Sequence, residues 1–214
     1  SIFADNTDLN IPFMPQSASD IAPVWNPEAF FNTMVVNGKT WPQLEVASER
    51  YRLRVLNAAD SRFLNLALFE VTGNGLDGIP GTADDVLGDE IPLYQIGAEQ
   101  GLLPEVVRIQ TGEAVTLPGD GSEPDPAPDP NDPTALLVGP AERADVIVDF
   151  TGLADGTVVR MTNTAPDAPF GGFPDDPADP GTTGQVMQFV IDTTLNAVGG
   201  DPSTAPKDLE LDEN

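Results

Sequence analysis

The sequence predicts an all-β sandwich, and three observations lead to this prediction. Short segments in which every second residue is apolar recur along the chain, separated by turns rich in Gly, Pro and Asp. No segment sustains helical periodicity over three turns. The length of 214 residues suits one sandwich, and many short strands at this spacing are typical of that fold.

The expected strands begin with a hairpin. The motif VVNG at 35–38 favours a tight turn at its Asn-Gly pair. The segment 51–56 then alternates, with its Tyr, Leu and Val on one face and its two Arg on the other. Further strands are expected at 65–68, 105–110, 113–117, 144–150, 157–162 and 185–191.

Acidic segments rich in Pro and Gly interrupt this pattern. We expect residues 74–90, 119–133 and 166–184 to be loops inserted between core strands, and 196–214 to be an acidic linker or tail. Together they hold more than half of the 35 acidic residues. Residues 1–195 are therefore expected to be one domain. The chain opens as if in the middle of a strand, so we expect a fragment of a longer protein.

Charge and composition exclude several classes of function. Nine basic and 35 acidic residues give a net charge of −26, which repels phosphate and anionic lipid, so we expect neither nucleic acid nor a membrane as a partner. Solubility in a salty medium, where counterions screen self-repulsion, is the simplest interpretation. The chain contains no His and no Cys, which excludes disulfides, thiolate metal sites and Ser-His triads.

The acidic loop at 74–90 carries two motifs. Its GxGxxG pattern, at 73–78, is followed by Pro80-Gly81 where a dinucleotide site needs a helix, so we expect no such site. Its carboxylates are weak candidates for Ca²⁺, although they do not fit an EF-hand frame, and a solvated acidic loop is the simpler interpretation. These candidates are Asp77, Asp84, Asp85, Asp89 and Glu90.

More specific motifs follow one another along the chain. VVNGKTWP at 35–42, YRLRVLNAADSRFLNL at 51–66, YQIGAEQGLL at 94–103 and GPAERADVIVDF at 139–150 resemble, in the same order, the middle cupredoxin-like domain of three-domain multicopper oxidases. NTAPDAPFGG and VMQFVI resemble that domain's last strands. The nearest branch is the bacterial spore-coat laccases and bilirubin oxidases. The resemblance implies a cupredoxin-like Greek-key β-sandwich with long acidic loop insertions.

The resemblance also implies a function. In that family copper is held by the first and third domains, so this chain would bind no copper, hold those two partner domains in register and form part of the substrate-pocket wall. The fragment alone would not be an enzyme. The parent, with copper as cofactor, would oxidise phenols, pigments or metal ions one electron at a time and reduce O₂ to water. We expect a secreted or periplasmic protein from a marine or high-salt source.

The resemblance places candidate pocket residues in three segments. One residue precedes the VNGK strand, two follow the RVLNA strand, and the others lie in the loop after the TN pair at 162–163. They are Pro27, Asp60, Ser61, Ala165, Pro166, Phe170, Gly171, Gly172 and Phe173. The two phenylalanines either cover a small aromatic substrate or pack against the third domain.

Two further expectations complete the set. Arg54, Arg62 and Arg143 are expected to pair with Asp145 or Glu142 and to stabilise the sandwich. The alternative function, from a different class, is a standalone acidic extracellular β-sandwich for adhesion or binding, with or without Ca²⁺. His-x-His pairs in flanking sequence would distinguish the oxidase from this alternative.

Overall fold

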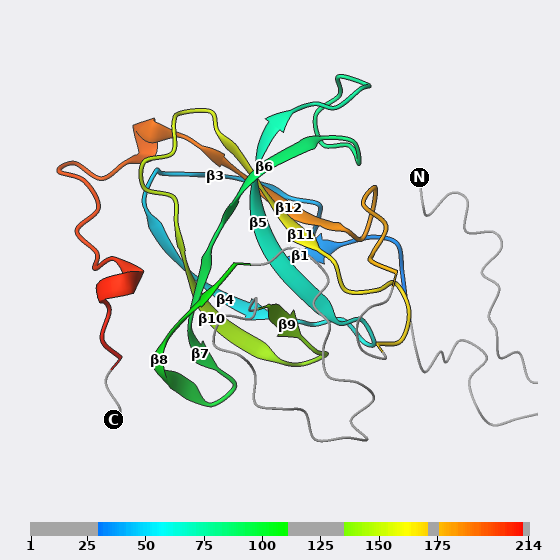
Figure 1. The fold of residues 1–214 in the computed structure, drawn as a ribbon, viewed down its shortest axis with the longest axis horizontal. Helices are drawn as coiled ribbons and strands as arrows, with labels where there is room; N and C mark the ends of the chain where they lie inside the picture. The colour runs from blue at the N-terminus through cyan, green and yellow to red at the C-terminus, as the bar shows by residue number, and fades with distance from the viewer. Residues whose placement is uncertain (1–29, 111–134, 171–175, 212–214) are drawn as a thin grey trace, which may run out of the picture.

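The computed structural model describes residues 30–110, 135–170 and 176–211. Two β-sheets pack against each other, and the helices of these described residues are short 3-10 turns, η2 (Thr193–Leu195) and η3 (Pro206–Asp208) (Figure 1). The predicted all-β sandwich is confirmed. In the part of the chain that is described, no helix is long and apolar enough to span a membrane.

The larger sheet has the order β3-β12-β11-β5-β6. These strands are β3 (Gln43–Val46), β12 (Gln185–Ile191), β11 (Val158–Asn163), β5 (Leu64–Gly73) and β6 (Val86–Ile91), and β9 (Leu136–Val138) pairs with the start of β5. Neighbouring strands run antiparallel, except that β3 and β12 are parallel. The parallel pair therefore joins two segments from opposite ends of the described chain.

The smaller sheet has the order β4-β10-β7-β8 and is antiparallel throughout. Its strands are β4 (Arg50–Leu56), β10 (Arg143–Asp149), β7 (Leu93–Ala98) and β8 (Gly101–Ile109). A separate hairpin joins β1 (Val35–Val36) to β2 (Lys39–Thr40). Its turn residues Asn37 and Gly38 have φ of 50° and 80°, the left-handed pair that a two-residue hairpin favours, so the predicted turn is confirmed.

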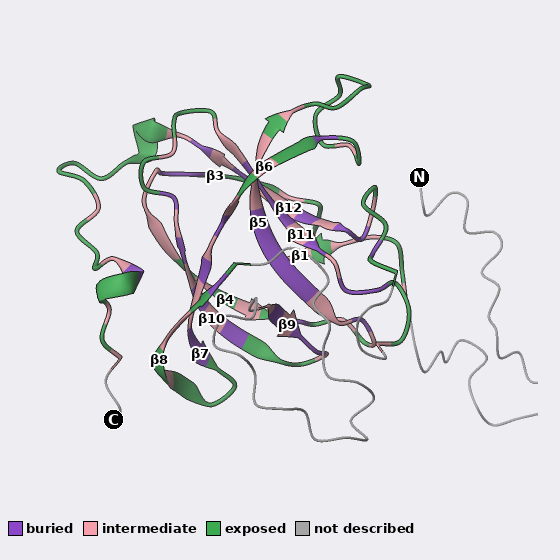
Figure 2. Cartoon of the chain, viewed as in Figure 1, coloured by how far each residue is buried: buried purple, intermediate pink, exposed green. Residues whose placement is uncertain are grey.

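The hydrophobic core lies between the two sheets (Figure 2). Alternate residues of β10 point into it, as the period-2 pattern predicts. The rings of Phe150 and Phe189, from the two sheets, lie 5.3 Å apart between centroids, and Tyr51 lies 5.9 Å from Phe150. The Tyr51 hydroxyl also accepts a hydrogen bond from the backbone N–H of Ala47 at 2.8 Å. Aromatic packing therefore ties the sheets together near one end of β4 and β10.

The observed strands differ from the expected ones in several places. β5 is longer than the expected 65–68, and β7 and β9 were not expected. The acidic loop ends at Asp85 rather than at residue 90, because Val86–Ile91 forms the edge strand β6. Acidic and glycine residues on β6 hide its alternation. The expected strand at 113–117 and the loop at 119–133 lie outside the described residues.

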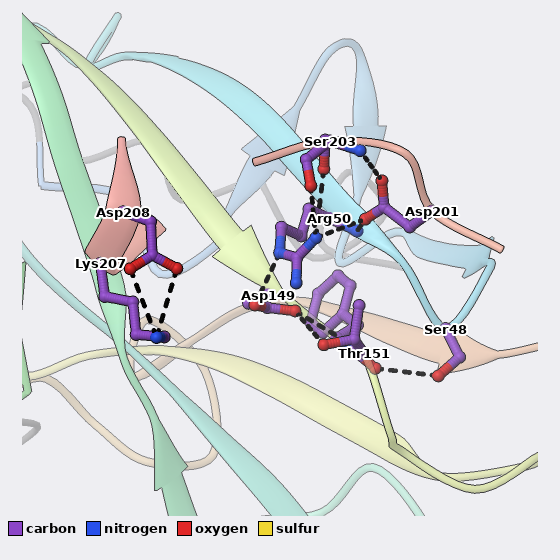
Figure 3. Close-up of polar contacts among 9 residues, drawn as sticks. Ser48, Arg50, Asp149, Thr151, Asp201, Ser203, Lys207 and Asp208 are labelled. Atoms are coloured by element: carbon purple, nitrogen blue, oxygen red, sulfur yellow. Dashed lines mark hydrogen bonds and ion pairs between the residues drawn. The ribbon is translucent and has the colours of Figure 1, made fainter. Parts of the chain in front are cut away.

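The C-terminal segment is not a free tail in its described part. Residues 196–211 run along the sandwich, where the Arg50 backbone N–H donates to Asp201 at 2.9 Å and the Arg50 guanidinium donates to the Ser203 carbonyl at 2.9 Å (Figure 3). Arg50 also forms an ion pair with Asp149 at 2.9 Å. Hydrogen bonds from Ser203 and from the Arg50 N–H hold the pKa of Asp201 below its usual value.

The expected ion pairs were wrong in their partners. Asp145 lies opposite Arg54 in strand register but pairs diagonally with Arg52 at 2.5 Å. Arg143 pairs with Glu99 at 2.6 Å. The Glu142 carboxylate accepts a hydrogen bond from the Gly139 N–H at 2.6 Å instead.

Arg62, which was expected to join this group of ion pairs, forms its ion pair with Asp167. It follows the end of β4, so its side chain reaches a loop beyond β11 rather than strand β10.

Candidate functional site

Two loops that carry candidate pocket residues contact each other at one end of the sandwich. One loop follows β4 and the other follows β11. Arg62 of the first pairs with Asp167 of the second, and Phe63 stacks on Phe170 with 4.6 Å between ring centroids and 21° between ring planes. We name residues 57–63 and 164–170 the paired loops.

Buried asparagines give each paired loop its shape. The Asn57 amide donates to the carbonyls of Arg62 at 2.7 Å and Val138 at 2.9 Å, which closes the first loop into a turn. The Asn163 side-chain oxygen accepts from the backbone N–H groups of Asn65 at 2.9 Å and Ala165 at 3.1 Å. Because a buried amide must satisfy its hydrogen bonds, each asparagine fixes the backbone around it.

The Arg62 side chain is almost fully buried and has three kinds of partner. Its Nη1 donates to Asp167, its Nη2 donates to the Phe31 carbonyl at 2.8 Å, and its guanidinium lies 5.6 Å from the centroid of the Phe30 ring. Arg62 therefore joins the paired loops to the segment that precedes the β1–β2 hairpin.

The Asp167 carboxylate accepts hydrogen bonds from three other residues. Besides Arg62, its carboxylate accepts from the Thr183 hydroxyl at 2.5 and 2.6 Å and from the Asp179 backbone N–H at 2.9 Å. Burial acts to raise the pKa of Asp167, but these hydrogen bonds and the nearby guanidinium outweigh it and hold the pKa below its usual value. The carboxylate is thus ionised and ties the segment 179–183 to the paired loops.

The structure separates the candidate pocket residues into three groups. Asp60 is exposed, and Ser61 and Phe170 are partly exposed, so these three belong to the surface. Ala165 and Pro166 are buried, because the second loop turns inward directly after Asn163, and their place in a pocket wall stays a prediction. Pro27, Gly171, Gly172 and Phe173 lie outside the described residues.

The loop that carries the Ca²⁺ candidates folds around its own carboxylates. Asp84 accepts from the backbone N–H groups of Leu76 at 2.6 Å and Asp77 at 3.1 Å, and from the Thr82 hydroxyl at 2.7 Å. The hydroxyl is the main cause that lowers the pKa of Asp84. Gly75, with φ of 62°, lies so close that an added Cβ would be 2.3 Å from the Asp84 carbonyl oxygen. The loop is therefore shaped by hydrogen bonds and a required glycine.

The Ca²⁺ candidates do not gather into one group of carboxylates in the described structure. Asp85 turns inward to pair with Arg160 at 2.8 Å, whereas Asp89 and Glu90 are consecutive strand residues and point to opposite faces of β6. Within the described residues, no group of three or more His, Cys, Asp and Glu side chains could hold a metal ion. The GxGxxG motif ends β5 and leads into turns, so the expected absence of a helix there is confirmed.

The Arg62–Asp167 and Arg160–Asp85 ion pairs are structural features that sequence reasoning missed. Asp167 lies 105 positions from Arg62, and Asp85 lies 75 positions from Arg160. Both carboxylates are found in acidic segments where any of several Asp residues matched the pattern equally well. The one usable signal was the scarcity of cations, since nine basic residues face 35 acidic ones and each cation is expected to have a partner.

Comparison with known proteins gives no matching family model but several relatives. The chain is 34% identical over 170 residues to "Multicopper oxidase LPR1 homolog 5" of Oryza sativa subsp. japonica, covering 78% of this chain and 20% of that protein. It is 32% identical over 209 residues to a laccase of Bacillus subtilis, covering 96% of this chain and 30% of that one. A laccase of Haloferax volcanii is 28% identical over 213 residues, with 96% and 28% covered.

The chain thus spans about a fifth to a third of the length of these curated relatives. Among solved structures it is similar to the McoA multicopper oxidase of Aquifex aeolicus, with 23% identity and a TM-score of 0.47, over 78% of this chain and 27% of that one.

Proposed function

The chain belongs to the multicopper oxidases, as a segment that spans 20–30% of its relatives' length, and we propose that it is their central, copper-free, cupredoxin-like domain. In this role it holds the first and third cupredoxin domains of the same parent chain in register. The paired loops form part of the wall of the substrate pocket. The observation that carries the proposal is the joining of these two loops by the Arg62–Asp167 and Phe63–Phe170 contacts.

The residues of this chain do not fit a copper ion. Imidazole and thiolate are the ligands that copper prefers, and the sequence has neither. Copper in the parent is therefore held by other parts of that protein. The contribution of this chain is to position the neighbouring domains and to shape the pocket. The parent's reaction, on this proposal, is the one-electron oxidation of phenols, pigments or metal ions coupled to the reduction of O₂ to water.

The acidic surface supports a proposal on location. A net charge of −26 is tolerated best where salt screens the repulsion between neighbouring carboxylates. We therefore place the parent outside the cytoplasm, secreted or periplasmic, in a marine or other high-salt medium. The rival function, a Ca²⁺-dependent binding module, finds no gathered carboxylates in the described residues to support it.

The test uses the parent protein with its copper in place. Phe170→Ala should change KM or selectivity across a series of substituted phenols while leaving the rate of O₂ reduction by the reduced enzyme unchanged. The matched control is Leu195→Ala, which removes an exposed apolar side chain from η2, outside the paired loops. If Phe170→Ala leaves phenol kinetics unchanged and only lowers stability, the paired loops serve packing and the pocket-wall role is wrong.

A further inference from the structure

The outer face of the larger sheet is covered by two loops. Residues 74–85 follow β5, and residues 176–184 precede β12. They approach each other closely, since a Cβ added to Gly181 would lie 3.7 Å from the Ala83 Cβ. Between them lies a hollow of about 280 Å³, whose walls include Trp41, Gly81, Arg160, Gly181, Gln185 and Gln188.

A buried guanidinium forms the floor of this hollow. Arg160 lies on β11 with 5% of its side chain exposed, and its Nη2 donates to Asp85 at 2.8 Å and to the Gln188 side-chain oxygen at 3.2 Å. Its Nε and Nη1 have no acceptor among the described residues. A guanidinium carries five N–H donors, so most donors of Arg160 have no acceptor in the part of the chain that the structure describes.

The partner of this arginine is also incompletely satisfied. Asp85 Oδ2 accepts from Arg160 and from the Gly81 backbone N–H at 2.8 Å, but Oδ1 is buried with no hydrogen-bond partner among the described residues. Buried polar groups are nearly always paired, and an exception calls for a physical reason. The Arg160–Asp85 pair is thus almost fully buried, and Arg160, which lines the hollow, has N–H donors left for a further acceptor.

Trp41 forms a rigid wall of the same hollow. Its indole N–H donates to the carbonyls of Gln185 at 2.9 Å and Thr182 at 3.1 Å, so the ring cannot turn freely. Its φ is 39°, in the left-handed region that costs energy for a residue with a bulky side chain. Such strain persists where surrounding contacts impose it, and it concentrates at binding sites.

We propose that this hollow binds a small aromatic molecule that carries an acceptor oxygen, with an aromatic carboxylate as the preferred ligand. The oxygen accepts from the open N–H edge of Arg160, and the ring packs on Trp41. The size is suitable, because a cavity of about 150 Å³ holds benzene. The site uses none of the paired-loop residues, so an experiment can contradict this proposal without contradicting the pocket-wall role, and the reverse.

Charge gives the site a recognisable salt dependence. The chain's net charge of −26 repels an anion at long range, and salt screens that repulsion. The contact with the guanidinium is short and partly buried, so salt weakens it less. Binding of a carboxylate should therefore tighten as salt rises, whereas binding of the uncharged amide should change little.

The test titrates the 214-residue chain with benzoate, benzamide, benzylamine and cyclohexanecarboxylate, and follows the Trp41 indole N–H by NMR. Comparison with Trp41→Phe assigns that signal. We expect saturable shifts in the order benzoate, then benzamide, with weak shifts for benzylamine, which lacks an acceptor, and for cyclohexanecarboxylate, which lacks a flat ring. No saturable shift with benzoate or benzamide, or an equal shift with benzylamine, overturns the proposal.

Two variants test the named contacts. Arg160→Lys keeps a cation beside Asp85 but loses the planar N–H edge, and should weaken benzoate about tenfold or more. Trp41→Leu removes the flat ring and should weaken benzoate similarly. Because this variant lacks the indole N–H, its affinity is measured from the proton signals of benzoate itself, and it keeps the test decisive if Arg160→Lys does not fold. The control is Leu44→Ala, an exposed residue of β3 that does not line the hollow. Unchanged affinity in both variants contradicts the assignment.

Discussion

Two arginine–aspartate pairs fasten loops to this sandwich, and their surroundings differ sharply. In the Arg160–Asp85 pair both side chains are buried, with 5% and 1% exposed, and one carboxylate oxygen has no hydrogen-bond partner within residues 30–110, 135–170 and 176–211. In the Arg62–Asp167 pair the arginine is buried at 6% but the aspartate is 37% exposed and receives donors from Thr183 and Asp179 as well. The first pair is buried except where Arg160 lines the hollow, and it has few hydrogen bonds, whereas the second is open on its aspartate side and has several.

The comparison indicates that the distance between two opposite charges does not by itself determine how much their contact contributes to the free energy of folding. A buried pair has lost most of the hydration of both ions, so each ion depends on the other, and removal of one leaves a buried uncompensated charge. An open pair retains water on one side, so its contribution is smaller and responds to pH and salt. The following experiments test this difference, from the largest expected effect to the smallest.

Removal of Asp85 should have the largest effect. Asp85→Ala leaves the Arg160 cation buried and unpaired, and we expect the free energy of unfolding to fall by about 3–5 kcal/mol in chemical denaturation. Asp89→Ala, on the same acidic stretch but exposed, should change it by less than about 0.5 kcal/mol. The double variant Asp85→Leu with Arg160→Met should recover most of the loss, since it removes both charges. A loss in the double variant as large as in Asp85→Ala would show that lost packing, not charge, explains the result.

Neutralising Asp167 should cost less. Asp167→Asn keeps the shape of the side chain but removes the charge that attracts Arg62, and we expect a loss of about 1 kcal/mol because the carboxylate is partly solvated. Thermal unfolding of the two proteins side by side measures it. A loss as large as that of Asp85→Ala would contradict the comparison, because the contribution of an ion pair to stability would then not depend on the solvent exposure of its side chains.

Lowering the pH should weaken the stabilisation that the Arg62–Asp167 pair contributes. The pKa of Asp167 is lower in the folded protein than its usual value, so its contribution is fully present above the unfolded-state pKa of about 3.9 and is lost as pH falls through the folded-state pKa. We expect Asp167→Asn to flatten the fall in stability below about pH 4. The measurement is a series of denaturation curves from about pH 6 to pH 2.5. Parallel curves for the two proteins would assign the acid sensitivity to other carboxylates.

The smallest effect is expected where the C-terminal segment meets Arg50. Asp201→Ala removes the ion pair and the hydrogen bond to the Arg50 N–H, and we expect a fall of at most about 1 kcal/mol in global stability. Local opening should be clearer, with faster hydrogen exchange at Arg50 and faster proteolysis within 196–211. Asp208→Ala, whose partner Lys207 is its exposed neighbour in sequence, is the matched control and should change neither.

The sequence was most informative where local physics decides structure. Alternation predicted β4, β10, β11 and β12 because one face of each strand is buried, and the Asn-Gly pair predicted the β1–β2 hairpin because few residues accept positive φ. β6 was missed because it is an edge strand, where acidic residues and glycine are tolerated and the alternation is weak.

The candidate site was only partly predictable. The resemblance placed Asp60, Ser61 and Phe170 on loops that do come together. The resemblance also placed Ala165 and Pro166 among the pocket residues, although both are buried, because a sequence motif does not show which way a loop turns. Ion-pair partners such as Asp167 and Asp85 depend on contacts between distant segments, and an acidic chain offers many equivalent choices for each arginine.

The parallel pairing of β3 with β12 has a consequence for how the protein is made. Gln43 and Gln188 are partners in this pair although 145 positions separate them, so the larger sheet is incomplete until its last strand has left the ribosome. Until then β11 offers an unpaired edge to other chains, and such edges promote aggregation. Contacts between distant segments also slow folding. Translation speed over residues 185–191 and chaperone protection of the nascent chain should therefore govern the yield of this protein in a cell.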